Sequence, residues 1–172
     1  MKIKEFIIVF IISVLPFLGM AQPCATGNEK VVSINSQFEH EVLRLTNVER
    51  KKHGLQPLVW NEALGYSARY HAQDMALDNY FDHDSFDRTS KGQLKKICDT
   101  FTRIEAFYSS NYMAENIAAG RITPEDVVNG WMKSDGHRKN ILNGDFNQLG
   151  VGYYETTSAD YPTYWVQNFG KN

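Results

Sequence analysis

Two histidines have sequence surroundings that suit a chemical site. His83 lies among aromatic and acidic residues, and an acidic neighbour can fix the tautomer of an imidazole ring. His137 follows Gly136 at the expected start of a short helix, where the helix dipole favours the neutral imidazole that accepts a proton or binds a metal. Taken alone, either histidine is more often an ordinary surface residue than a functional one. The other three, His40, His53 and His71, are expected to have structural or surface roles.

One carboxylate stands in an unusual context. Glu115 interrupts a stretch of small and apolar residues, 114–120. A carboxylate is rarely buried without a partner, so a nearby imidazole, metal or backbone amide is implied if this stretch packs inside the protein. An exposed strand end is the alternative.

Other chemical templates do not match. The chain has no G-x-S-x-G nucleophile elbow, no H-E-x-x-H helix, no glycine-rich phosphate loop and no dinucleotide fingerprint. The acid-rich loop around His83 fails as a calcium loop, because Phe86 stands where an oxygen ligand is needed and Asp87 where the turn glycine belongs. Familiar hydrolase, protease and nucleotide-binding chemistries therefore lose their main support.

Composition and charge restrict the class of protein further. The 172 residues are 42% hydrophobic and 22% charged, which is typical of one globular domain. Eighteen Lys and Arg against twenty Asp and Glu give a formal net charge of -2, so no basic surface for nucleic acid is expected.

The N-terminal residues predict export. Residues 1–21 combine a charged start, a short apolar run and small residues at the end, which is typical of a cleaved signal peptide rather than a stable membrane span. Residues 22–35 form an irregular arm, and residues 36–172 form the domain. Secretion, or release into a periplasm, would expose Cys24 and Cys98 to oxidising conditions, where a disulfide and two free thiols both remain open.

Helices dominate the first part of the domain and strands the last. A capping-box pattern at 36–39 starts a helix over 37–53, and Asn61 starts a second that ends near 79. Residues 81–113 are interpreted as a long loop with a short helix around 94–101. Thr123 and Pro124 start another helix, residues 135–142 form a helical turn, and 149–155 with 163–169 form a hairpin. This order predicts a compact α+β layer arrangement.

Five motifs in this order resemble the CAP superfamily, in its bacterial SCP-like branch. This superfamily includes cysteine-rich secretory proteins, antigen 5 and pathogenesis-related proteins. The resemblance covers about residues 38–170, and its motifs are Phe81-Asp82-His83, Ala114-Glu115-Asn116-Ile117, the run from Trp131 to Leu142, Leu149-Gly150-Val151-Gly152-Tyr153, and Tyr164-Trp165-Val166-Gln167-Asn168-Phe169.

The resemblance implies a three-layer α-β-α sandwich with a central cleft, lined by two histidines and, in many members, two glutamates. His83, Glu115 and His137 match three of these positions. Ser134 stands where the W-x-x-E motif of eukaryotic members places the second glutamate, which weakens any two-carboxylate catalytic scheme.

The leading hypothesis is a secreted, monomeric protein whose cleft binds a divalent metal and a lipid, glycan or peptide. Two neutral imidazoles and a carboxylate suit zinc best among divalent metals, with Glu115 as ligand or as orienter of a histidine. The same trio could instead hold a substrate by hydrogen bonds. The alternative is a metal-assisted hydrolase with Glu115 as general base, and a third interpretation moves function to an outer partner-binding face. Whether the protein is an enzyme stays open.

Overall fold

The computed structural model describes residues 24–172 of the chain, so the expected signal peptide, residues 1–21, lies outside the described part. In chain order the elements are α1 (Ser36–Lys52), β1 (Val59–Trp60), α2 (Glu62–Leu77), β2 (Ser85–Arg88), β3 (Leu94–Cys98), α3 (Thr100–Phe107), β4 (Met113–Ala119), α4 (Pro124–Lys133), α5 (Asp135–Ile141), β5 (Gln148–Glu155) and β6 (Thr163–Gly170).

The main sheet has four strands in the order β1-β5-β6-β4. The expected hairpin is confirmed, since β5 and β6 pair antiparallel along their whole length. Strand β4 adds antiparallel to β6 and forms one edge, and the short β1 pairs parallel with β5 at the other. Strands β2 and β3 form a separate two-stranded sheet.

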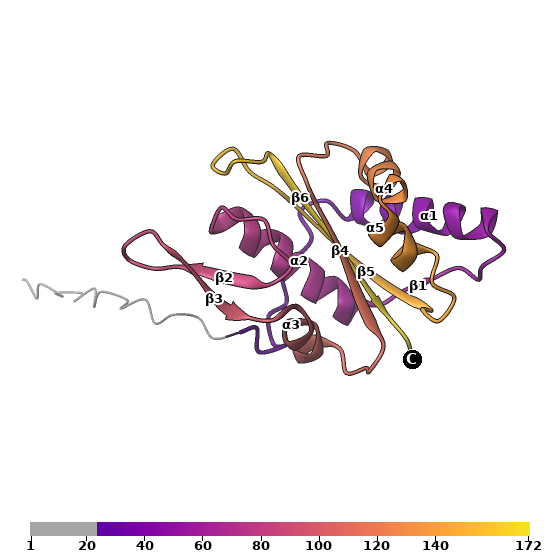
Figure 1. The fold of residues 1–172 in the computed structure, drawn as a ribbon, viewed down its shortest axis with the longest axis horizontal. Coiled ribbons are helices and arrows are strands. Elements are labelled where there is room, and N and C mark those ends of the chain that lie inside the picture. The colour runs from indigo at the N-terminus through magenta and orange to yellow at the C-terminus, as the bar shows by residue number, and fades with distance from the viewer. Residues whose placement is uncertain (1–23) are drawn as a thin grey trace, which may run out of the picture.

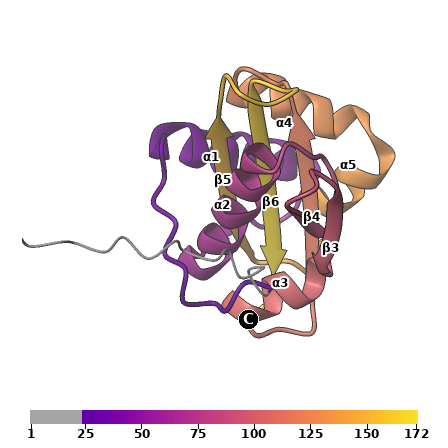
Figure 2. The ribbon, with the colours of Figure 1, turned by 90° about the vertical axis from the view of Figure 1, so that its left-hand side faces the viewer.

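Helices cover both faces of the main sheet (Figures 1 and 2). Helix α2 packs on one face through a stripe of small and apolar residues, and α1 and α4 enclose a larger cluster on the other face. Helix α5 contacts β4 on the α4 side. The fold is therefore the predicted α+β class, a three-layer α-β-α sandwich with a C-terminal antiparallel hairpin.

Glycines in β5 allow α2 to lie directly on the sheet. A Cβ atom at Gly150 would come within 2.1 Å of the α2 backbone, and one at Gly152 within 2.2 Å. Real Cβ atoms cannot approach this closely, so a larger residue at either position would force helix and strand apart. This contact sets the distance between α2 and the main sheet.

Most helix starts agree with the sequence. The side chains of Asn61 and Thr123 each accept a hydrogen bond from the backbone amide three residues further on. The capping box at α1 is wrong: the N-cap is Asn35, one residue before Ser36, and Glu39 forms a buried ion pair with an arginine of α2 instead of reaching back. Asn35 supplies the local cap, and the carboxylate of Glu39 binds a distant cation.

The prediction for residues 81–113 is also wrong. These residues form β2, β3, α3 and the start of β4 rather than a loop with a helix at 94–101. Asp84, from the turn before β2, accepts hydrogen bonds from the backbone amide and hydroxyl of Thr100, both at 3.0 Å. The cap of α3 therefore comes from a residue sixteen positions earlier, which no local pattern predicts.

The N-terminal arm is linked to the end of β3 and packs against α3. Cys24 and Cys98 form a disulfide with 5.0 Å between their Cα atoms. Gly27 has a φ of +81°, and a Cβ there would lie 1.9 Å from the carbonyl oxygen of Ala106, so the arm approaches the helix as only glycine allows. Within residues 24–172, no helix is both long and apolar enough to cross a membrane.

Candidate functional site

Strand β4 buries Glu115 at the edge of the main sheet. Its side chain is 1% exposed, and it pairs in register with Asn168 of β6. The His83 ring contacts one carboxylate oxygen, with Nδ1 3.0 Å from Oε1. The other oxygen, Oε2, accepts a hydrogen bond from Arg103 Nη2 at 2.5 Å. Asn168 adds a third donor at 3.1 Å when its amide nitrogen is oriented toward Oε2.

Arg103 of α3 holds both members of this pair. Its side chain is fully buried, and its Nη1 donates to the carbonyl oxygen of His83 at 3.0 Å and to the Ser85 hydroxyl at 2.9 Å. One guanidinium therefore neutralises Glu115 and fixes the loop that carries His83. Neither the motifs nor the spacing single out Arg103, whose role depends on α3 packing beside β4.

Arg103 decides the protonation state of Glu115. Burial alone would raise the pKa of this carboxyl, but the charge of Arg103, with smaller contributions from His71 and His83, keeps the pKa below its ordinary value. Glu115 is an anion at neutral pH, with both oxygens engaged.

His83 has one protected and one open side. Its hydrogen bond to Glu115 raises its pKa, against the smaller effect of partial burial. With the Nδ1 hydrogen donated to the carboxylate, the Nε2 lone pair of the neutral ring is free, and the side chain is 49% exposed. This carboxylate-imidazole arrangement is the one that orients histidines toward metals or substrates.

His137 lies near this pair without touching it. Its carbonyl oxygen accepts a hydrogen bond at 3.2 Å from Asn116, the residue after Glu115. Partial burial lowers the pKa of His137, and the charge of His83 lowers it further, so the ring is neutral at pH 7. His137 lines a pocket of about 240 Å³ between β4 and α4, together with Ser134.

A third histidine supports the loop from below. His71 of α2 is completely buried, and its Nε2 lies 2.9 Å from the carbonyl oxygen of Asp82 and 4.0 Å from Glu115 Oε1. Burial, followed by the charge of Arg103, lowers its pKa to about 3. The role of His71 is therefore structural: its neutral ring holds Asp82, the residue before His83, in place.

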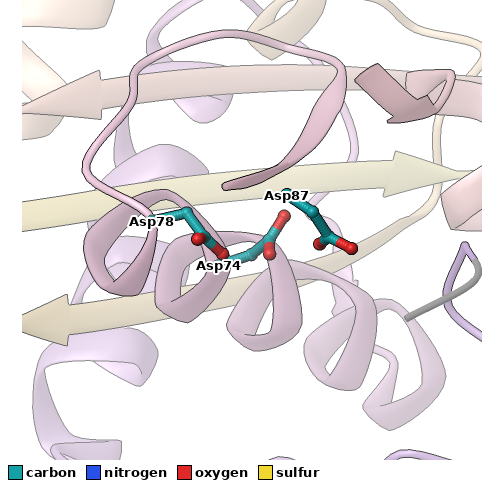
Figure 3. A group of neighbouring side chains, drawn as sticks. All are labelled: Asp74, Asp78 and Asp87. Carbon is teal, nitrogen blue, oxygen red and sulfur yellow. The ribbon is translucent and has the colours of Figure 1, made fainter. Parts of the chain in front are cut away.

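The structure also gathers three acids that sequence analysis did not connect. Carboxylate oxygens of Asp74, Asp78 and Asp87 lie within 4.8 Å of one another where α2 ends beside β2 (Figure 3). Within residues 24–172, no other three His, Cys, Asp or Glu side chains have potential metal-ligand atoms within 4.8 Å of one another. His83, Glu115 and His137 therefore do not meet this distance limit. Burial raises the pKa of Asp74 to about 6, despite a hydrogen bond from Tyr80.

Comparison with known proteins places the chain in a family. The model of the CAP, or cysteine-rich secretory protein, family matches residues 43–169. This chain belongs to the CAP family. The CAP domain is 47% identical over 135 residues to the uncharacterised protein YkwD of Bacillus subtilis, an overlap that covers 78% of this chain and 47% of YkwD.

Solved structures agree with this assignment. An extracellular protein with an SCP domain from Bacillus anthracis is 33% identical, with a TM-score of 0.66 over 81% of this chain and 42% of its own. An outer surface protein of Borrelia burgdorferi is 26% identical, with a TM-score of 0.64 over 82% of this chain and 98% of its own. The CAP domain thus spans less than half the length of YkwD and of the Bacillus anthracis protein.

Proposed function

We propose that this CAP-family protein is exported and binds a divalent metal through the imidazoles of His83 and His137. Glu115 acts as the residue that orients His83. The observation that carries the proposal is a series of contacts from Arg103 to Glu115 to His83. The buried Arg103–Glu115 ion pair holds the half-exposed imidazole of His83 in place.

The donor set suits a metal in two respects. His83 keeps Nε2 free because its Nδ1 contacts a carboxylate, as metal-bound histidines commonly do. His137 has a lowered pKa, so it offers a neutral ring at pH 7. Zinc is the metal that two imidazoles with remaining water ligands would suit best, and two protein ligands favour modest affinity.

The contacts of Glu115 favour an orienting role over the alternatives. As a ligand it would have to give up Arg103 or His83, and as a general base it would need access to water that a 1% exposed side chain lacks. A metal-assisted hydrolase is therefore the weaker proposal. Turnover of a peptide, ester or glycan by the zinc-loaded protein would favour it instead.

Zinc titration calorimetry tests the metal site. We expect the His83→Ala, His137→Ala double variant to lose the binding heat, and His53→Ala, which removes an exposed histidine from the end of α1, to keep it. Glu115→Gln should weaken binding by about tenfold without abolishing it, in line with residues that support metal ligands. Equal heats from the wild type and the double variant would remove the proposed site.

Export is a separate part of the proposal. Support comes from the leader pattern in residues 1–21, the Cys24–Cys98 disulfide, and the extracellular or surface descriptions of the Bacillus anthracis and Borrelia relatives. Mass spectrometry of the expressed full chain should find a mature form that begins at Gln22 outside the cytoplasm. An intact N-terminus on cytoplasmic protein would contradict this.

A further inference from the structure

The pocket beside His137 contains polar side chains for which residues 24–172 supply no hydrogen-bond or ion-pair partner. Ser134 occupies the N-cap position of α5, yet its hydroxyl forms no capping hydrogen bond. Arg121 follows β4, and its guanidinium forms no ion pair within residues 24–172, whereas Arg103 pairs with Glu115. Three potential donors, from Arg121, Ser134 and His137, therefore line one hollow of about 240 Å³.

The backbone around Arg121 is firmly held. Its carbonyl oxygen accepts hydrogen bonds from the Thr163 hydroxyl at 2.7 Å and from the Trp165 indole at 2.6 Å. Its guanidinium lies beside α4 at Gly130, where a Cβ would be 3.5 Å from Nε. The backbone of Arg121 is therefore fixed, and its guanidinium lies beside α4, the helix that forms one wall of the pocket.

The charge balance of the pocket favours an anion. Among the described residues no Asp or Glu lines it, so none of them neutralises the charge of Arg121 there. A guanidinium presents two parallel donors that match a carboxylate, and a serine hydroxyl can donate to the same group. Ala118, Val127 and Trp131, which pack together on the α4 side of the sheet, contribute apolar residues to the lining.

We infer that this pocket is a subsite for a carboxylate with a short apolar substituent, bound by Arg121 and Ser134. The inference deepens the proposed function and rests on it, because His137 belongs to both the metal site and this pocket. At about 240 Å³ the hollow is smaller than the roughly 300–1,000 Å³ of sites that enclose a whole ligand. It therefore takes a terminal group of a larger ligand, such as the end of a peptide.

The test compares an acid with its neutral isostere. In metal-free buffer, N-acetyl-alanine is titrated against the ¹⁵N-labelled full chain and followed by NMR, with N-acetyl-alaninamide and inorganic phosphate as parallel probes. We expect saturable shifts at Gly130 and Ser134 with the acid, and at least about tenfold weaker binding of the amide, because charge-assisted hydrogen bonds are lost. Equal binding of acid and amide would overturn the inference, as would tighter binding of phosphate than of the acid.

Variants separate this subsite from the metal site. Arg121→Gln should weaken acid binding at least about tenfold, and Ser134→Glu should abolish it by placing an anion opposite the guanidinium. Lys133→Gln removes a charge from the end of α4 without altering the pocket lining, so it should leave acid binding unchanged. His83→Ala should lose zinc binding and keep acid binding, whereas Arg121→Gln should do the reverse. Unchanged acid binding by Arg121→Gln would overturn the subsite whatever the zinc result.

Discussion

Helix α2 runs beside two groups of ionisable side chains. The carboxyl pKa is lowered in one group and raised in the other. Near its middle, His71 lies below Glu115, which is almost completely buried and has a lowered pKa. One turn later, Asp74 is less buried, yet its pKa rises to about 6. Burial acts in the same direction on both, so depth cannot explain the difference.

The partners explain it. Glu115 faces the guanidinium of Arg103, whereas Asp74 has a phenol hydroxyl from Tyr80 and feels the like charge of Asp78. A buried cation reverses the effect of desolvation, and a neutral donor only reduces it. The first group can therefore hold the His83 imidazole in one orientation, whereas in the second group burial and the charge of Asp78 both disfavour the charged form of Asp74.

Removing the cation should have the largest effect. Arg103→Met leaves Glu115 buried without its arginine, with only His83 and Asn168 as partners. We expect a loss of about 3–5 kcal/mol in the free energy of unfolding, measured with denaturant. The matched control is Arg121→Gln, which removes an exposed cation and should cost less than about 0.5 kcal/mol.

A second substitution sharpens this prediction. Replacing both partners, in Arg103→Met with Glu115→Met, also removes the buried carboxylate that has lost its arginine and should recover most of the lost stability. A double variant no more stable than Arg103→Met would mean that packing of α3, rather than charge, gives the arginine its value.

Neutralising the carboxylate should flatten the dependence of stability on pH. The pKa of Glu115 is lowered by folding, so its contribution is present above its ordinary pKa of 4.5 and lost as the pH falls through the folded value. The pKa of His83 is raised, so its contribution is present below 6.5 and lost as the pH rises through the folded value.

Glu115→Gln should remove both contributions and lower the pKa of His83, which NMR titration of the ring would detect. The Glu41→Gln variant removes an exposed carboxylate on α1 and serves as the control, since it should leave the pKa of His83 unchanged. An unaltered His83 pKa in Glu115→Gln would contradict the orienting role.

The smallest effect is expected at the acidic group. Asp74→Asn should stabilise the protein by about 1 kcal/mol at pH 7, because a raised pKa means that the charged form is disfavoured by folding. Well below its ordinary pKa of 3.8 the gain should vanish, since the aspartate is then protonated in both states. Thermal unfolding at the two pH values would measure this, and equal effects would show that the charge of Asp74 is not the cause.

Local patterns predicted much of the fold. The caps at Asn61 and Thr123 and the β5–β6 hairpin depend on neighbours within a few residues, which a sequence displays directly. Predictions failed where a distant group replaced a local one, as when Asp84 capped α3 and when Glu39 paired across to α2.

The sequence by itself determined which residues could do chemistry, namely His83, Glu115, His137 and the unusual Ser134, and the resemblance of its motifs indicated the family. Only the tertiary structure decided that Arg103 neutralises Glu115 and that Arg121 shares a pocket with Ser134. The reason is physical: the charge state and free donors of a side chain depend on groups within a few ångströms, and folding brings these together from distant parts of the chain.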